Sequence, residues 1–166
     1  TAGGIAVTST GRIIAGNSTS TGTIQLSSGS ITGDQLLEGR LEAGERITVD
    51  APGGRISGTG QLLAPDVVLN AGTGIGSNLP LQLTASRITA ESADGVVHLT
   101  NSRDGQFTRL AAREGAVIVT GHGNTLIDDA LTVNGSISLT AIDGDLTVRV
   151  ARQQNSGSIS LATLSS

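Results

Sequence analysis

The stretch Gly135-Ser136-Ile137-Ser138-Leu139-Thr140-Ala141 decides the fold: two aliphatic residues separated by one polar residue, then a small residue two positions later. Such alternation is typical of a short strand with one buried face. The shape recurs along the chain, and its last aliphatic residues form the series Val7, Leu26, Val49, Leu69, Leu99, Val119, Leu139 and Leu161. Most successive members lie about 20 residues apart, and such a repeat predicts a stack of similar coils.

Each repeat also contains a second short alternating segment, as in Ser86-Arg87-Ile88-Thr89-Ala90. Small residues such as Ala51 and Ala71 follow the aliphatic pair, where an inward position at a corner has little room. Asp94-Gly95 and Asp143-Gly144 supply residues that accept positive φ. No apolar face with a 3.6-residue period persists, so helices are not expected. We therefore predict an all-β fold, a right-handed parallel β-helix of about seven to eight coils.

The composition fits a narrow aliphatic core. The 166 residues include no Cys, Met, Trp or Tyr, and the only aromatic residue is Phe107. The absence of Cys excludes disulfides and thiolate metal sites. Since no Met is present, we expect residues 1–166 to be a single β-helical repeat segment of a larger protein. The long interval between Leu69 and Leu99 predicts an irregular or enlarged coil around residues 70–98.

Charge and hydropathy exclude two classes of partner. The formal net charge is −4, with arginines and acidic residues interspersed, and nothing resembles a basic stripe with stacking aromatics. We therefore expect no nucleic-acid partner. No apolar run approaches the roughly 18 residues that a membrane span needs, so the chain is not expected to span a membrane.

Three segments carry a family resemblance: Ala71-Gly72-Thr73-Gly74-Ile75-Gly76-Ser77, Pro80-Leu81-Gln82-Leu83 and Gly95-Val96-Val97-His98-Leu99. Together with Gly135–Ala141 and Gly144-Asp145-Leu146-Thr147-Val148, they resemble the repeat region of filamentous haemagglutinin-like exoproteins. The resemblance covers roughly residues 1–162. It implies the right-handed β-helical shaft of a large adhesin, a virulence-type protein on the surface of a Gram-negative bacterium or secreted from it.

The resemblance also implies the partners of the chain. They are the rest of the parent exoprotein, an outer-membrane partner of two-partner secretion, and a glycan or receptor on a host or cell surface. The Asn-Pro-Asn motifs of the family's secretion domain are missing here. The resemblance therefore places the segment in the shaft or a distal region of an extracellular protein.

Two groups of residues offer weaker chemical signals. Gly121-His122-Gly123 and Asp128-Asp129 are similar to polygalacturonase motifs, but their order is reversed and their spacing is short. Asp143 and Asp145 are interpreted as a corner in preference to a Ca²⁺ site, which needs six to eight oxygen ligands. We expect His98 to point outward and His122 to lie in a turn. The sequence thus predicts no catalytic, cofactor-binding or metal-ligating residue and no enzymatic activity.

A set of arginines each precedes an inward aliphatic residue, so that several would line one outer face and could contact a glycan: Arg12, Arg40, Arg55, Arg87 and Arg109. The leading hypothesis is a non-enzymatic structural shaft of a surface adhesin. One alternative is a fragment of a polysaccharide-active β-helix, a lyase or glycoside hydrolase. The second alternative is a glycan- or receptor-binding module that uses an outer face.

Overall fold

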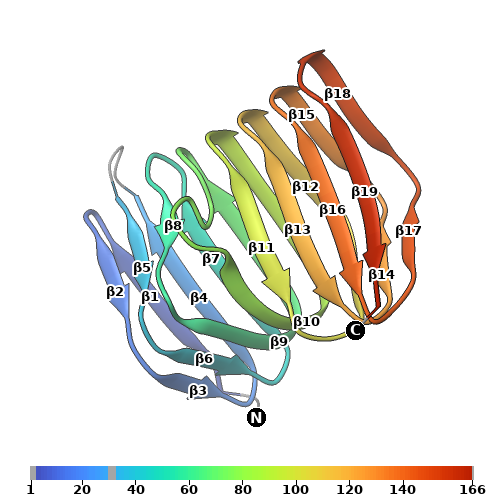
Figure 1. The fold of residues 1–166 in the computed structure, drawn as a ribbon. Coiled ribbons are helices and arrows are strands. Elements are labelled where there is room, and N and C mark those ends of the chain that lie inside the picture. Colours follow the sequence, from blue (N-terminus) through green and yellow to red (C-terminus); the bar gives the residue numbers. More distant parts are fainter. Residues whose placement is uncertain (1–2, 30–32, 166) are drawn as a thin grey trace.

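The computed structural model describes residues 3–29 and 33–165, and every regular element in these two ranges is a strand. Neighbouring strands pair in parallel from β1 to β19. The chain forms a parallel β-solenoid of about seven turns with a spacing of about 21 residues (Figure 1). The all-β fold and the parallel coils predicted from the sequence are confirmed.

The coils have three sides, which we number by the order in which the chain enters them. Side 1 is made of β1 (Ile5–Ser9), β4 (Thr23–Ser28), β7 (Arg46–Ala51), the second halves of β9 (Gln61–Ala71), β10 (Leu81–Asp94) and β12 (Gly105–Glu114), then β15 (Ala130–Asn134) and β18 (Ala151–Ser156). Side 2 is made of β2 (Ile13–Ala15), β5 (Gln35–Leu37), β8 (Ile56–Ser57), β11 (Val97–Asn101), β13 (Val117–His122), β16 (Ile137–Ile142) and β19 (Ile159–Leu164).

Side 3 has the shortest strands, and its position along the chain changes midway. It is made of β3 (Ser18–Ser20), β6 (Arg40–Ala43) and the first halves of β9 and β10, and later of the first half of β12, β14 (Thr125–Ile127) and β17 (Leu146–Val148). At the change, Leu81 pairs with Leu99 of β11, whereas Ile88 pairs with Phe107 of β12. The single strand β10 therefore pairs with two strands of the next coil, β11 and β12.

Asn101 closes the gap at this change of position. Its Oδ1 accepts the backbone N–H of Ala85 at 2.9 Å, and its Nδ2 donates to the carbonyl of Ala85 at 3.0 Å. Nδ2 also donates to the carbonyl of Arg103 at 2.8 Å. The fully buried Asn101 side chain therefore makes the hydrogen bonds that a backbone partner would otherwise make, at the point where β10 stops pairing with β11 and begins to pair with β12.

The series of aliphatic markers runs along two different sides. Val7, Leu26, Val49 and Leu69 are aligned on side 1, where the column continues through Ala90, Leu110, Ala130 and Ala151. Leu99, Val119, Leu139 and Leu161 are aligned on side 2. The long interval between Leu69 and Leu99 therefore joins residues of two columns, while the coil spacing along side 1 stays close to that of the other coils.

The stretch around residues 70–98 is irregular on side 2. Between β9 and β10, only Ile75 joins the ladder, through single bridges to Ile56 and Val97. The loop that follows Ile75 leaves Leu79 58% exposed. In this coil, side 2 thus consists of one bridging residue and a surface loop.

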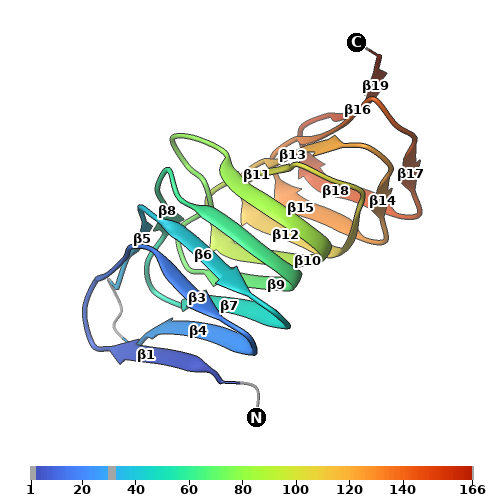
Figure 2. The same ribbon diagram turned by 90° about the horizontal axis from the view of Figure 1, so that it is seen from below.

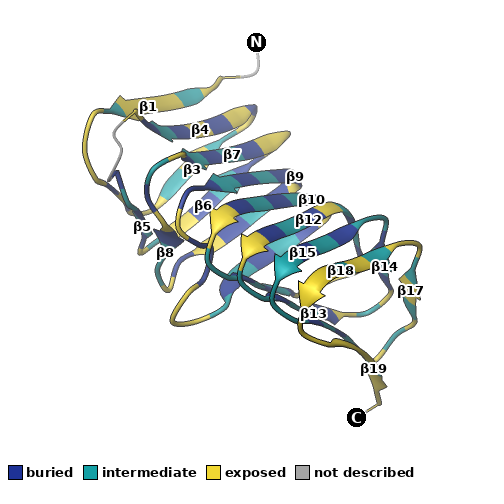
Figure 3. Ribbon diagram, turned by 90° about the horizontal axis from the view of Figure 1, so that it is seen from above, coloured by how far each residue is buried: buried dark blue, intermediate teal, exposed yellow. Residues whose placement is uncertain are grey.

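The core is a continuous aliphatic column inside the coils. Small residues occupy the predicted corner positions, and Ala51, Ala71, Ala85 and Ala141 are all buried. Phe107, the one aromatic residue, is fully buried. The alternation of buried and exposed positions is visible along the central strands, whereas β1, β18 and β19 at the two ends are largely exposed (Figure 3). Of the predicted positive-φ corners, Gly95 (φ 89°) and Asp143 (φ 58°) adopt that conformation.

We predict that Leu139→Asp abolishes cooperative unfolding of the chain. Leu139 is fully buried between Val119 and Leu161, and a carboxylate there would lose its hydration, at a cost of more than about 3 kcal/mol. Thermal unfolding followed by circular dichroism measures the effect. Ser138→Asp is the matched control, because Ser138 faces outward and its replacement should leave a cooperative transition. Retention of the wild-type melting curve by Leu139→Asp would contradict the assignment of this column to the core.

Candidate functional site

The most organised polar feature is a column of alternating charges on side 1. Arg46 of β7, Asp66 of β9 and Arg87 of β10 are aligned in three consecutive coils. Asp66 Oδ2 accepts from Arg46 Nε at 2.7 Å and lies 2.6 Å from Nη2, and Oδ1 lies 3.4 Å from Arg87 Nε. The Asp66 side chain is only 9% exposed, whereas the two arginine side chains are more than half exposed. One shielded carboxylate thus ties three coils together.

The same arrangement recurs at the end of side 3 in the C-terminal coils. Asp129 Oδ1 lies 2.8 Å from Arg152 Nη2, and its Oδ2 lies 3.6 Å from Arg109 Nη1. Arg109 Nε also contacts Glu91 Oε1 at 3.0 Å. The neighbouring Asp128 pairs with Arg149 Nη1 at 2.9 Å and accepts from Gln106 Nε2 at 2.5 Å. Every one of these contacts joins residues of different coils.

A third carboxylate combines an ion pair with a backbone contact. Asp34 Oδ1 accepts the backbone N–H of Arg55 at 3.0 Å, while Oδ2 lies 3.2 Å from Arg55 Nε. Arg12 occupies the equivalent position one coil before Asp34, because Ile13 pairs with Gln35. Arg, Asp and Arg therefore occupy three successive coils in three places along the solenoid, with Arg152 displaced from Asp129 by two residues along side 1.

Amide and carboxylate side chains also fix the corner between sides 2 and 3. Asp104 Oδ1 accepts the backbone N–H of Asn124 at 2.8 Å, and Asn124 Oδ1 accepts that of Asp145 at 3.1 Å. The corner predicted at Asp143-Gly144 therefore lies next to Asp145, the last residue in this series of contacts. In the two described ranges, no group of three or more His, Cys, Asp or Glu side chains is placed to hold a metal ion.

The structure spreads the five predicted arginines over the three sides. Arg12 and Arg55 directly precede strands of side 2, Arg40 begins β6 on side 3, and Arg87 and Arg109 belong to side 1. Arg40 pairs with Glu42 on its own strand at 3.1 Å, and Arg55, Arg87 and Arg109 pair with carboxylates as described above. Only Arg87 and Arg109 lie on neighbouring coils of one side. These pairings leave a surface of mixed charge around the arginines.

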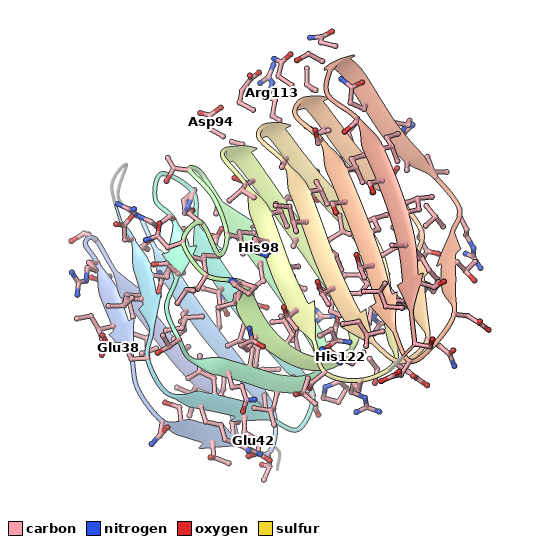
Figure 4. All side chains as sticks on the ribbon, in the orientation of Figure 1. Glu38, Glu42, Asp94, His98, Arg113 and His122 are labelled. Carbon is pink, nitrogen blue, oxygen red and sulfur yellow. The ribbon has the colours of Figure 1, made fainter. Side chains whose placement is uncertain are left out.

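The residues similar to polygalacturonase motifs do not form a common group. His122 ends β13 and is exposed, and β14 separates it from Asp128 and Asp129. Both aspartates contact arginines of other coils. Figure 4 shows His122 near the corner below β13 and His98 on β11, well apart from each other. The aspartates therefore act as partners of arginines.

His98 faces outward from β11 between the buried Val97 and Leu99, in the orientation expected from the sequence. It is partly buried, and this desolvation lowers the pKa of its imidazole below 6.5. The neutral form is thus favoured in the folded chain.

The carboxylates Asp34, Asp66 and Asp129 were missed as a group by sequence reasoning. The signal that identifies them is the occurrence of opposite charges one coil apart, at Arg46, Asp66 and Arg87 for example. Detecting it requires the register of the coils, because it is invisible in the local pattern around each residue. The arginines alone, taken without their partners, suggest a more cationic surface than the structure presents.

We predict that Asp66→Asn lowers the free energy of unfolding by about 1 kcal/mol, because both arginine partners are largely exposed to solvent. The loss should shrink in concentrated NaCl, where the ion pairs are screened. Chemical denaturation at low and high salt measures both effects. Asp94→Asn on the exposed end of β10 is the control, with little expected change. Equal losses for the two variants would contradict the role of Asp66 as an inter-coil tie.

We predict that protonation of His98 destabilises the folded chain. Its pKa is lowered by folding, so its contribution is fully present above pH 6.5 and is lost as the pH falls below that value. The difference in melting temperature between the wild type and His98→Asn should therefore change between about pH 7 and pH 5. His122→Asn, at an exposed position, is the control. A pH-independent difference for His98→Asn would refute this assignment.

Comparisons with family models, with curated proteins and with solved structures gave no match for the chain. Residues 3–29 and 33–165 contain no helix of the length and apolar character that crossing a membrane requires. The parallel β-solenoid and its charge columns are established by the structure.

Proposed function

We propose that this chain is a non-enzymatic shaft segment of a large secreted bacterial adhesin of the filamentous haemagglutinin-like type. In this role it holds binding regions of the parent exoprotein away from the cell. The parent would reach the extracellular surface through an outer-membrane partner. The proposal joins the β-solenoid fold to the resemblance carried by the repeat segments.

The observation that carries the proposal is the uninterrupted side-1 ladder. Eight strands pair in sequence from β1 to β18, and the inward residues of all inner coils are buried. Each inner coil is held by backbone hydrogen bonds and buried aliphatic residues on both of its faces. A body built this way lengthens by about 4.8 Å for each added coil and resists bending. These are the mechanical properties that a shaft needs.

The charged residues favour a shaft over the two alternative functions. Asp128 and Asp129 contact arginines of other coils, which favours a structural role over acid–base chemistry on a polysaccharide. Four of the five predicted glycan-facing arginines pair with carboxylates, which reduces their attraction for an acidic glycan. Most of these contacts link coils to one another.

The test is removal of one coil in register. Deletion of residues 117–136 joins Ala116 to Ile137, which pairs with Val117 and occupies the same position one coil later. We predict that the shortened chain unfolds cooperatively and that its length, measured by X-ray scattering, falls by about 4.8 Å. In the parent exoprotein, attachment per surface molecule should stay at the wild-type level.

Deletion of residues 117–126 is the matched control, because it removes β13 and most of β14 and places Asp128, Asp129 and the side-1 strand β15 where side 2 requires a strand. This chain should lose cooperative unfolding. Loss of attachment by the in-register deletion, with unchanged surface abundance, would assign a receptor-binding site to the removed coil and overturn the shaft proposal. Turnover of pectin, alginate or a glycosaminoglycan by the chain would overturn its non-enzymatic character.

A further inference from the structure

The strands of side 2 carry no charge. Every charged residue that lies within a described strand belongs to side 1 or side 3, as in β7, β10 and β12. The strands of side 2, as the structure describes them, contain no Arg, Asp or Glu. Charges of both signs spread over a surface keep soluble chains from associating. Side 2 is therefore the flank of the solenoid that lacks this protection.

The uncharged surface is best formed in the C-terminal half, where Figure 1 shows β11, β13 and β16 side by side. Their outward residues form two columns, which together we call the side-2 face: His98, Ile118 and Ser138, and Thr100, Thr120 and Thr140. Desolvation lowers the pKa of His98, so this face is uncharged near neutral pH. All three strands have a paired neighbour on both edges, so the face belongs to the inner coils.

A loop beside the side-2 face adds apolar surface to the same flank. Residues 76–80 leave the ladder between Ile75, which bridges to β11, and Leu81, which pairs with it. Leu79 in this loop is 58% exposed, and from β4 to β17 no other large aliphatic residue among those described is as exposed. Exposed apolar residues on a surface depleted of charge are typical of protein contact sites.

We propose that side 2 binds side 2 of a second copy of this chain, so that two solenoids lie side by side. Coils about 4.8 Å apart in one copy match those of the other in period along the whole contact. Two such sheets can pack face to face about 10 Å apart. The contact lies on the flank and leaves both ends of the solenoid free. It rests on the fold and is independent of the proposed adhesive role.

The chemistry of the face favours a second copy over other partners. A charged partner would have to bury its charges against Ile118 and Thr120 without a counter-charge, which is costly. The one aromatic residue, Phe107, is fully buried, so the face offers no ring on which a sugar could stack. A second copy presents aliphatic groups to aliphatic groups. Its threonine hydroxyls can both donate and accept, so the hydroxyls of two copies can satisfy each other.

The size of the flank sets the strength of the contact. The five residues of β11 span about 17 Å, and about seven turns at about 4.8 Å give a flank of about 600 Å² per copy. A standard interface buries roughly 800 Å² per partner. We therefore expect a weak dimer of the 166-residue chain. Each further coil with an uncharged side 2 would strengthen it.

The experiment measures the mass of the chain by sedimentation over a range of concentrations. A contact that uses the same surface of both copies closes at the dimer, so the mass should rise from 16.5 kDa toward twice that value. Ile118→Arg should weaken dimerisation at least about tenfold, because each dimer would bury two unpaired guanidinium groups. Val68→Arg is the matched control, because Val68 faces outward on side 1 in an inner coil and its replacement should leave dimerisation unchanged.

Cysteine labelling gives a second, independent measurement. The chain has no Cys, so Thr120→Cys introduces its only thiol, in the middle of the side-2 face. Its reaction with a maleimide should slow as the protein concentration rises through the range in which dimers form. Thr48→Cys is the control, because Thr48 faces outward on side 1 and should react at the same rate throughout.

Several results would overturn the proposal. One is a wild type that stays monomeric at all concentrations, and if it also bound insoluble cellulose through Ile118, the face would belong to a neutral glycan. Another is self-association that Ile118→Arg leaves unchanged, or that Val68→Arg weakens equally, since either would place the contact on another surface. Equal labelling behaviour of the two cysteine variants would have the same meaning. Melting curves establish that each variant is folded.

Discussion

The structure depends on parallel pairing in register between successive coils. Each coil is too thin to bury its own aliphatic residues, and only the coil on either side removes them from water. The backbone hydrogen bonds of sides 1 to 3 point along the solenoid axis, so the same neighbours satisfy both the polar backbone and the apolar side chains. Loss of register by a single position would turn Ile137, Leu139 and Ala141, the inward residues of β16, outward together. The same contacts between neighbouring coils therefore determine both the stability of the solenoid and its register.

Charged residues follow this constraint and reinforce it. Asp66 and Asp129 each contact arginines of both adjacent coils, and Asn101 replaces a missing backbone neighbour at the point where side 3 changes position. The exposed arginines make each ion pair individually weak. Their placement between coils nevertheless favours one register over its alternatives, since a slip would separate opposite charges. These polar groups therefore contribute more to the selection of one register than to the free energy of unfolding.

The sequence predicts the coil and its inward residues well, because both are local. Alternation around Leu139 and the small residue at Ala141 identify a buried strand and a corner without knowledge of the neighbours. The change from side 1 at Leu69 to side 2 at Leu99 is not local, and it made one regular stack look like a repeat with a long interval. The ion pairs of the Asp66 column could not be predicted from the sequence for the same reason. Its members lie a full coil apart along the chain, and only the register shows that they touch.

A solenoid of this kind has no internal feature that ends it. Inner coils such as that of Val119 are covered on both faces, but the coils of Val7 and Leu161 are covered on one. A compact globular fold closes on itself, whereas a translation repeated along an axis leaves two unlike surfaces that fit each other. The ends must therefore be covered by further coils, by a cap or by another molecule. The regularity that allows coils to be added one after another also leaves an end coil incomplete wherever the stack stops (Figure 2).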